Sequence, residues 1–145
     1  MKEDIIKQER GLMIFKKIYS YYLLYCFLLS VIGYLADCLF GFKYAIQNLN
    51  YLPWYFISHT VFQVYVILPA ILGYVLIAES RANHMVIKLL YLLIVSFFIA
   101  SFLYPDDYSL YIGSFKKIKQ VTVYILSGLV LFWWAERREI LYLKL

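Results

Sequence analysis

Charged residues are scarce in this sequence of 145 residues: Asp, Glu, Lys and Arg together make up 16% of it. Soluble globular domains contain about 25% charged and roughly 45–50% apolar residues, whereas 64% of this chain is hydrophobic. A chain of this size cannot hide so much apolar surface in one core. The composition therefore argues against a soluble domain and favours a protein whose solvent is the lipid bilayer.

Cysteine and histidine are also few, and their positions exclude several kinds of site. Cys26 and Cys38 are twelve residues apart, or about 18 Å along a helix, which is too far for a disulfide bond. His59 and His84 fall on opposite membrane faces in the topology predicted below, so we expect no metal site. A glycine-rich nucleotide loop and a GxSxG motif are both lacking. We therefore expect a non-enzymatic protein with no catalytic residues and no cofactor.

Aromatic residues, in contrast, are abundant, with 16 tyrosines and 3 tryptophans. Rings with an apolar body and a polar tip suit the headgroup layer of a membrane. The net charge of +5 does not indicate nucleic-acid binding, because the basic residues stand at the ends of hydrophobic runs and form no stripe that could follow a phosphate backbone. We expect no direct contact with nucleic acid.

Four long apolar runs predict an all-α, polytopic membrane protein, a four-transmembrane-helix bundle that forms one domain over residues 1–145. The predicted spans are residues 18–40, 52–78, 84–104 and 118–135.

Individual residues shape three of these spans. Pro69 lies in the middle of the second span and should kink it, because proline removes a backbone hydrogen bond. Lys88, one turn inside the third span, should snorkel to the interface. The fourth span is short, since the apolar run 121–135 covers about 22 Å. We extend it upstream to Ile118, with Lys119 snorkelling outward.

Basic flanks set the predicted orientation. With the N-terminus inside, ten Lys and Arg residues fall on the cytoplasmic side and four on the outer side. The cytoplasmic set is Lys2, Lys7, Arg10, Lys16, Lys17, Arg81, Lys88, Arg137, Arg138 and Lys144, and the outer set is Lys43, Lys116, Lys117 and Lys119. We therefore expect both termini in the cytoplasm and a multi-pass protein of the bacterial inner (cytoplasmic) membrane.

Residues 1–17 mix charges with Ile5, Ile6, Leu12 and Met13, which fall on one side of a helix. This pattern predicts a short amphipathic helix at the membrane interface, leading into the first span.

Three polar residues inside the spans form the candidate site. An ionisable group within a membrane is costly, which makes Asp37 and His59 functional candidates. Gln63 follows His59 by one helical turn and shares its face. Asp37 and His59 both lie toward the outer leaflet, so a contact between them is possible. The cluster either conducts protons, senses a ligand or binds a partner, or it is structural hydrogen bonding between helices.

Small residues recur in three of the predicted spans. They are Ser30 and Gly33, Ala70 and Gly73, and Ser127 and Gly128. Such positions let helices approach closely, either within one subunit or between copies of the chain in a homo-oligomer. Both explanations stay open.

The tail at residues 136–145 places Ile140 and Leu141 after a charged patch that contains Arg137 and Arg138. It is either an interfacial extension of the last helix or a docking peptide for a cytoplasmic protein partner. These four residues are the candidate partner-facing surface.

Span number, inside termini and a composition rich in Lys, Ile and Tyr resemble two kinds of small bacterial membrane protein. One is the four-span membrane subunit of Kiwa-type anti-phage systems, which works with a cytoplasmic DNA-binding partner. The other is the immunity protein that protects a cell from a pore-forming colicin. The resemblance covers the whole chain but rests on no residue motif, so it assigns no functional residue.

Three functional hypotheses follow. The first is a membrane scaffold or sensor subunit, oligomeric and coupled to a cytoplasmic partner, as the first resemblance implies for anti-phage defence. The second is an immunity protein that blocks a pore-forming bacteriocin within the bilayer. The third is a small proton-coupled transporter that depends on Asp37 and His59.

Overall fold

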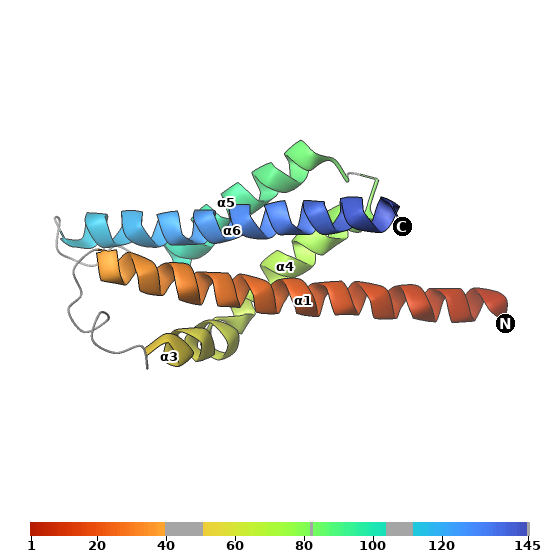
Figure 1. Ribbon diagram of the computed structural model, residues 1–145, viewed down its shortest axis with the longest axis horizontal. Helices are drawn as coiled ribbons and strands as arrows, with labels where there is room; N and C mark the ends of the chain where they lie inside the picture. The colour runs from red at the N-terminus through yellow and green to blue at the C-terminus, as the bar shows by residue number, and fades with distance from the viewer. Residues whose placement is uncertain (40–50, 82, 104–111, 145) are drawn as a thin grey trace.

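The computed structural model describes residues 1–39, 51–81, 83–103 and 112–144, and these ranges contain helices and no strand. This confirms the all-helical prediction. The elements are α1 (Lys2–Leu39), α3 (Tyr51–Ile57), the π-helical turn η1 (Ser58–Phe62), α4 (Val64–Glu79), α5 (Met85–Leu103) and α6 (Ile112–Lys144). Helices α1 and α6 lie side by side and run in opposite directions, so the two ends of the chain lie at the same end of the bundle (Figure 1).

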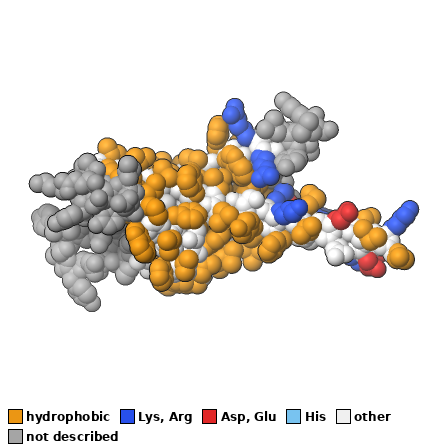
Figure 2. Space-filling model, turned by 60° about the horizontal axis from the view of Figure 1, so that its bottom comes forward, with side chains coloured by type: hydrophobic (Ala, Val, Ile, Leu, Met, Phe, Trp, Pro, Cys, Tyr) orange, Lys and Arg blue, Asp and Glu red, His pale blue; other side chains and the backbone are white. Residues whose placement is uncertain are grey.

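Three helical segments are long and apolar enough to cross a membrane: α1, α5 and the stretch Ile118–Arg138 of α6. The bent pair Leu52–Phe62 and Val64–Glu79 makes a fourth if it counts as one broken span. Hydrophobic side chains accordingly cover the middle of the molecule (Figure 2). The chain is therefore a membrane protein. Its last candidate span has 21 residues, because the helix continues on both sides of the fifteen-residue apolar run.

Helix α1 is unbroken for 38 residues, which corresponds to about 57 Å. The predicted interfacial segment 1–17 is not a separate helix, because residues 2–17 continue the helix that contains the first span. Residues 1–13 are all exposed, and this part of α1 projects beyond the bundle (Figure 1). The mixed charges at its start interrupt the apolar run without interrupting the helix.

The second span breaks at Gln63. The prediction that it is kinked at Pro69 is therefore wrong. The segments on either side of Gln63 are inclined at 73°, whereas α4 continues through Pro69. In η1 the N–H of Gln63 donates to the carbonyl of Ser58, five residues back, at 3.2 Å, which shifts the register of the backbone hydrogen bonds. The Tyr22 hydroxyl of α1 donates to the carbonyl of Thr60 at 2.5 Å. Helix α1 thus supplies a hydrogen bond to a backbone carbonyl at the break, where the regular backbone hydrogen bonding of the helix is interrupted.

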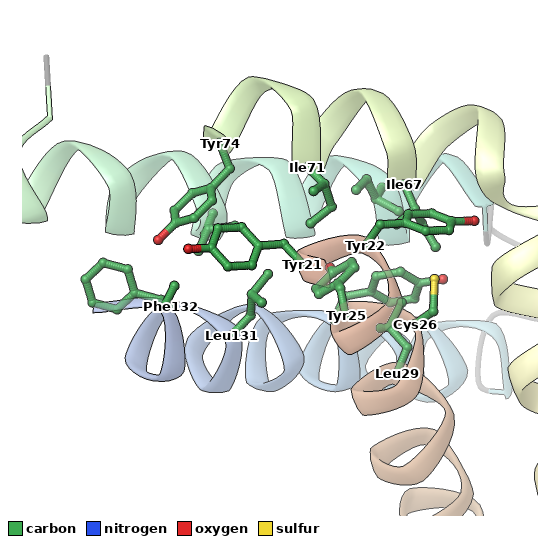
Figure 3. Close-up of a cluster of buried hydrophobic side chains, with 14 of the residues drawn as sticks. Tyr21, Tyr22, Tyr25, Cys26, Leu29, Ile67, Ile71, Tyr74, Leu131 and Phe132 are labelled. Carbon is green, nitrogen blue, oxygen red and sulfur yellow. The ribbon is translucent and has the colours of Figure 1, made fainter. Parts of the chain in front are cut away.

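Tyrosines dominate the core between α1, α4 and α6 (Figure 3). Tyr21, Tyr25, Tyr74 and Tyr124 are each at most 2% exposed. The ring of Tyr21 packs against those of Tyr74 and Trp134, with centroids 6.0 and 5.8 Å away. The Tyr21–Tyr74 rings are tilted and the Tyr21–Trp134 rings meet edge to face, and aromatic contacts with such defined geometry favour one relative placement of the helices.

Two glycines let helices approach closely within the chain. A Cβ atom on Gly128 of α6 would lie 2.9 Å from the Ser96 hydroxyl oxygen of α5, and one on Gly73 of α4 would lie 2.1 Å from the Tyr91 hydroxyl oxygen. At these two positions, close packing inside one subunit accounts for the small residue.

Two ion pairs join helices at the end of the bundle where α1 begins. The Lys17 ammonium of α1 lies 2.5 Å from the Glu79 carboxylate of α4, and Lys88 of α5 pairs with Glu136 of α6. Lys88 is 2% exposed, so the prediction that it snorkels outward is wrong. The carboxylate on the neighbouring helix holds its ammonium inside the bundle instead.

Candidate functional site

The opposite end of the bundle contains a cavity of about 290 Å³ between α1, α3, η1 and α6. Its polar lining consists of Asp37, Ser58, His59, Lys119 and Gln120. The aromatic side chains of Trp54 and Tyr55 complete one wall. The residues come from segments far apart in the sequence, so the cavity exists only in the packed bundle.

An ion pair between Asp37 of α1 and Lys119 of α6 forms the centre of this site. One carboxylate oxygen of Asp37 accepts a hydrogen bond from the Lys119 ammonium, and the other accepts one from the Tyr55 hydroxyl of α3. The Asp37 side chain is 14% exposed and the Lys119 side chain is 7% exposed. The prediction that Lys119 snorkels outward is therefore wrong. Asp37, two residues before α1 ends, gives the ammonium a partner inside the bundle.

A second polar group links η1 to α6 next to the ion pair. The side-chain oxygen of Gln63 accepts a hydrogen bond from the Tyr124 hydroxyl at 2.7 Å and lies 2.7 Å from His59 Nδ1. An amide oxygen only accepts hydrogen bonds, so Nδ1 carries the hydrogen in this arrangement. The rings of His59 and Tyr124 also meet edge to face, with centroids 6.3 Å apart.

The structure brings the three predicted polar residues to one region without joining them all directly. His59 and Gln63 are hydrogen-bonded to each other. Asp37 and His59 line the same cavity, but the bonds of the Asp37 carboxylate go to Lys119 and Tyr55. The site therefore consists of two adjacent polar groups, one bonded to Tyr55 of α3 and the other containing His59 of η1.

Lys119, Tyr55 and Tyr124 are the site residues that the sequence analysis missed. A buried aspartate requires a partner, and Lys119 is a basic residue near the outer end of the fourth predicted span. Asp37 and Lys119 lie at similar depths in their predicted spans, and this match was a signal in the sequence for the ion pair. The two tyrosines gave none, because 16 tyrosines are spread along the chain.

The arrangement is suited to hydrogen bonding rather than to holding a net charge. Asp37 and Lys119 balance each other, and in the described part of the chain neither Ser58 nor Gln120 has a side-chain partner. No group of three or more His, Cys, Asp or Glu side chains that could hold a metal ion occurs within the described ranges. A small polar molecule could use the free hydroxyl and amide groups.

At the other end, Arg137 and Arg138 stack on tryptophans of their own helix. Their guanidinium carbons lie 4.7 and 5.2 Å from the ring centroids of Trp133 and Trp134. Helix α6 continues to Lys144, so the tail extends the last helix. The side chains of the other two candidate partner-facing residues, Ile140 and Leu141, lie outside the described residues.

Comparison of the chain with protein-family models, with curated proteins and with solved structures finds no match.

Proposed function

We propose that this protein is a non-enzymatic sensor or scaffold subunit with four membrane spans and both termini in the cytoplasm. The observation that carries the proposal is the buried Asp37–Lys119 ion pair. It joins α1 and α6, the two helices that run from the cavity to the two ends of the chain. A change at the cavity would therefore act directly on both cytoplasmic ends.

The spacing of the ion pairs supports four spans. Lys17 and Asp37 are twenty residues apart on α1, and Lys119 and Glu136 are seventeen apart on α6. These separations correspond to about 30 and 26 Å, close to the roughly 30 Å of bilayer hydrocarbon. The paired charges thus mark two levels that match the two membrane surfaces.

The bent pair connects the same two levels. Tyr55 of α3 bonds to Asp37 at one end of α1, and Glu79 of α4 pairs with Lys17 toward the other end. One broken span therefore accounts for the pair better than a re-entrant loop does. With four spans, the distribution of basic flanks favours both ends of the chain inside the cell.

The exposed start of α1 is the surface that we propose for a cytoplasmic partner. Ile5, Ile6, Leu12 and Met13 are each more than half exposed and lie on the part of α1 that projects from the bundle. The resemblance to Kiwa-type membrane subunits supplies the proposed setting, the bacterial inner membrane and anti-phage defence. Self-association belongs to the same proposal.

Spin-label distance measurements test the coupling from the cavity to the chain ends. Labels replace two exposed residues near the ends proposed to be cytoplasmic, Met13 of α1 and Trp133 of α6, in a Cys38→Ser background, since Cys26 is fully buried. We expect Asp37→Asn to broaden or shift the distance distribution, because it weakens the bond between the two helices.

The charge swap Asp37→Lys with Lys119→Asp is the matched control for this experiment. It retains opposite charges at the two positions and should restore the original distribution. Identical distributions in Asp37→Asn and the unmodified chain would contradict the proposed coupling.

A proton-coupled carrier is the second candidate, because Asp37 and His59 line one cavity. Proton flux into vesicles that contain the purified chain tests it. The carrier hypothesis expects flux that is lost in the Asp37→Asn, His59→Gln double variant. Absence of flux above that of empty vesicles, or equal flux in the variant, would remove it.

A further inference from the structure

Two carboxylates, those of Glu79 and Glu136, form ion pairs between helices at the end of the bundle where α1 begins. Glu79 pairs with Lys17, and Glu136 pairs with Lys88, whose side chain is 2% exposed. Both carboxylates are therefore already paired with lysines of neighbouring helices. They do not compensate the basic residues at the ends of the spans, and the other described acidic residues of this end, Glu3, Asp4 and Glu9, lie on the part of α1 that projects beyond the bundle.

Three exposed basic residues stand next to the apolar parts of the helices at this end: Lys16, Arg81 and Arg137. We call them the basic collar. In the ranges that the structure describes, none of the three has a carboxylate within ion-pair distance. Each stands at an end of a candidate span, Lys16 before the apolar part of α1, Arg81 after α4 and Arg137 at the end of the span in α6. Lys and Arg side chains gather next to the hydrophobic surface at this end (Figure 2).

Tryptophan side chains place Arg137 at headgroup depth. Its guanidinium carbon lies 4.7 Å from the centroid of the Trp133 ring, and that tryptophan is 56% exposed. Exposed tryptophans at the end of a span favour the interface between hydrocarbon and headgroups. A guanidinium stacked there has its N–H groups available for phosphate oxygens, which it can bind in a bidentate manner.

We propose that the basic collar binds the phosphates of anionic phospholipids in the adjacent leaflet. The collar supplies three positive charges at the level where lipid phosphates lie, next to a surface that the acyl chains already cover. A zwitterionic headgroup carries its own positive charge, so its attraction to the three positive charges of the collar is weaker. The proposal goes beyond the sensor or scaffold function, and it assigns Arg137 to lipid rather than to a protein partner.

Lipid titration of the purified, full-length chain tests this proposal. Native mass spectrometry in mild detergent would compare binding of phosphatidylglycerol and phosphatidylcholine with matched acyl chains. One basic residue near an anionic surface contributes roughly fivefold in affinity. We therefore expect Arg81→Gln and Arg137→Gln each to weaken phosphatidylglycerol binding about fivefold, and phosphatidylcholine binding to stay unchanged.

Lys2→Gln is the matched control, because it removes the same charge from α1 fourteen residues before Lys16, or about 21 Å farther from the bundle. We expect it to have no effect. Equal affinity for the two lipids would overturn the proposal, as would equal losses in Lys2→Gln and Arg137→Gln. Loss of cross-linking to a protein partner in Arg137→Gln, with lipid binding intact, would identify the collar as a protein-docking surface and also overturn it.

Discussion

The two ends of the bundle use the same chemistry, lysine paired with carboxylate, to different effect. At the cavity end, Asp37 and Lys119 balance each other beside an open space of about 290 Å³. At the basic end, Glu79 and Glu136 pair with lysines of neighbouring helices, while Arg81 and Arg137 remain exposed without a paired carboxylate in the described ranges. The comparison teaches that an ion pair whose charges balance inside the bundle leaves a polar cavity in the interior. Basic residues without a paired carboxylate instead form a positively charged site on the surface.

The largest effect should come from breaking the ion pair at the cavity end. Asp37→Ala leaves Lys119, which is 7% exposed, without its carboxylate, and an uncompensated buried charge costs about 3–5 kcal/mol. Titration with a denaturing detergent measures the free energy of unfolding. The double variant Asp37→Leu, Lys119→Met should regain most of the loss. A single variant as stable as the original chain would show that the pair is not buried as described.

Replacing one glycine toward each end with alanine compares how tightly the helices are packed at the two ends. Gly73→Ala places a Cβ atom 2.1 Å from the Tyr91 hydroxyl oxygen, and such overpacking costs about 1–3 kcal/mol. At the cavity end, Gly33→Ala meets its nearest atom at 3.8 Å, so unfolding should need at least as much free energy as before. Thermal unfolding of both variants measures this difference in stability. Equal stability would mean that the ends are packed alike.

The break between the two ends depends on Tyr22. Tyr22→Phe removes the hydroxyl that donates to the Thr60 carbonyl, which should cost about 1 kcal/mol. Hydrogen exchange should also increase at amides near the break, from Gln63 to Ile67. Tyr19→Phe, on an exposed side chain of the same helix, is the control. Unchanged exchange in Tyr22→Phe would show that α1 does not stabilise the bend.

The smallest effect should come from the solvated ion pair at the basic end. The side chains of Lys17 and Glu79 are 32% and 26% exposed, and pairs with such access to water contribute about 0–1 kcal/mol. Lys17→Gln should therefore change the free energy of unfolding far less than Asp37→Ala. A loss as large as that of Asp37→Ala would show that both ends depend equally on their charges.

The sequence predicted the helices and the membrane environment because both depend on composition and local periodicity. Partners across helices are not local. Lys88 and Lys119 each look like a lysine near the end of a span, and only the carboxylate opposite each one explains why its ammonium points inward. The bend was assigned to Pro69 for a similar reason. Proline is visible in a sequence, whereas a π-helical register shift at Gln63, with a hydrogen bond from α1 nearby, is not.

In the proposed four-span arrangement, the two levels of paired charge also set the thickness of bilayer that this protein accommodates without deformation. A bilayer with longer acyl chains would bring Lys17 with Glu79, or Asp37 with Lys119, below the headgroups. The lipid around the bundle would then have to thin, whereas in a bilayer with shorter acyl chains the helices would tilt, and either adjustment costs a fraction of a kcal/mol per ångström of mismatch. Membranes of different thickness would therefore hold this bundle at different tilts, with the charged pairs as the reference points.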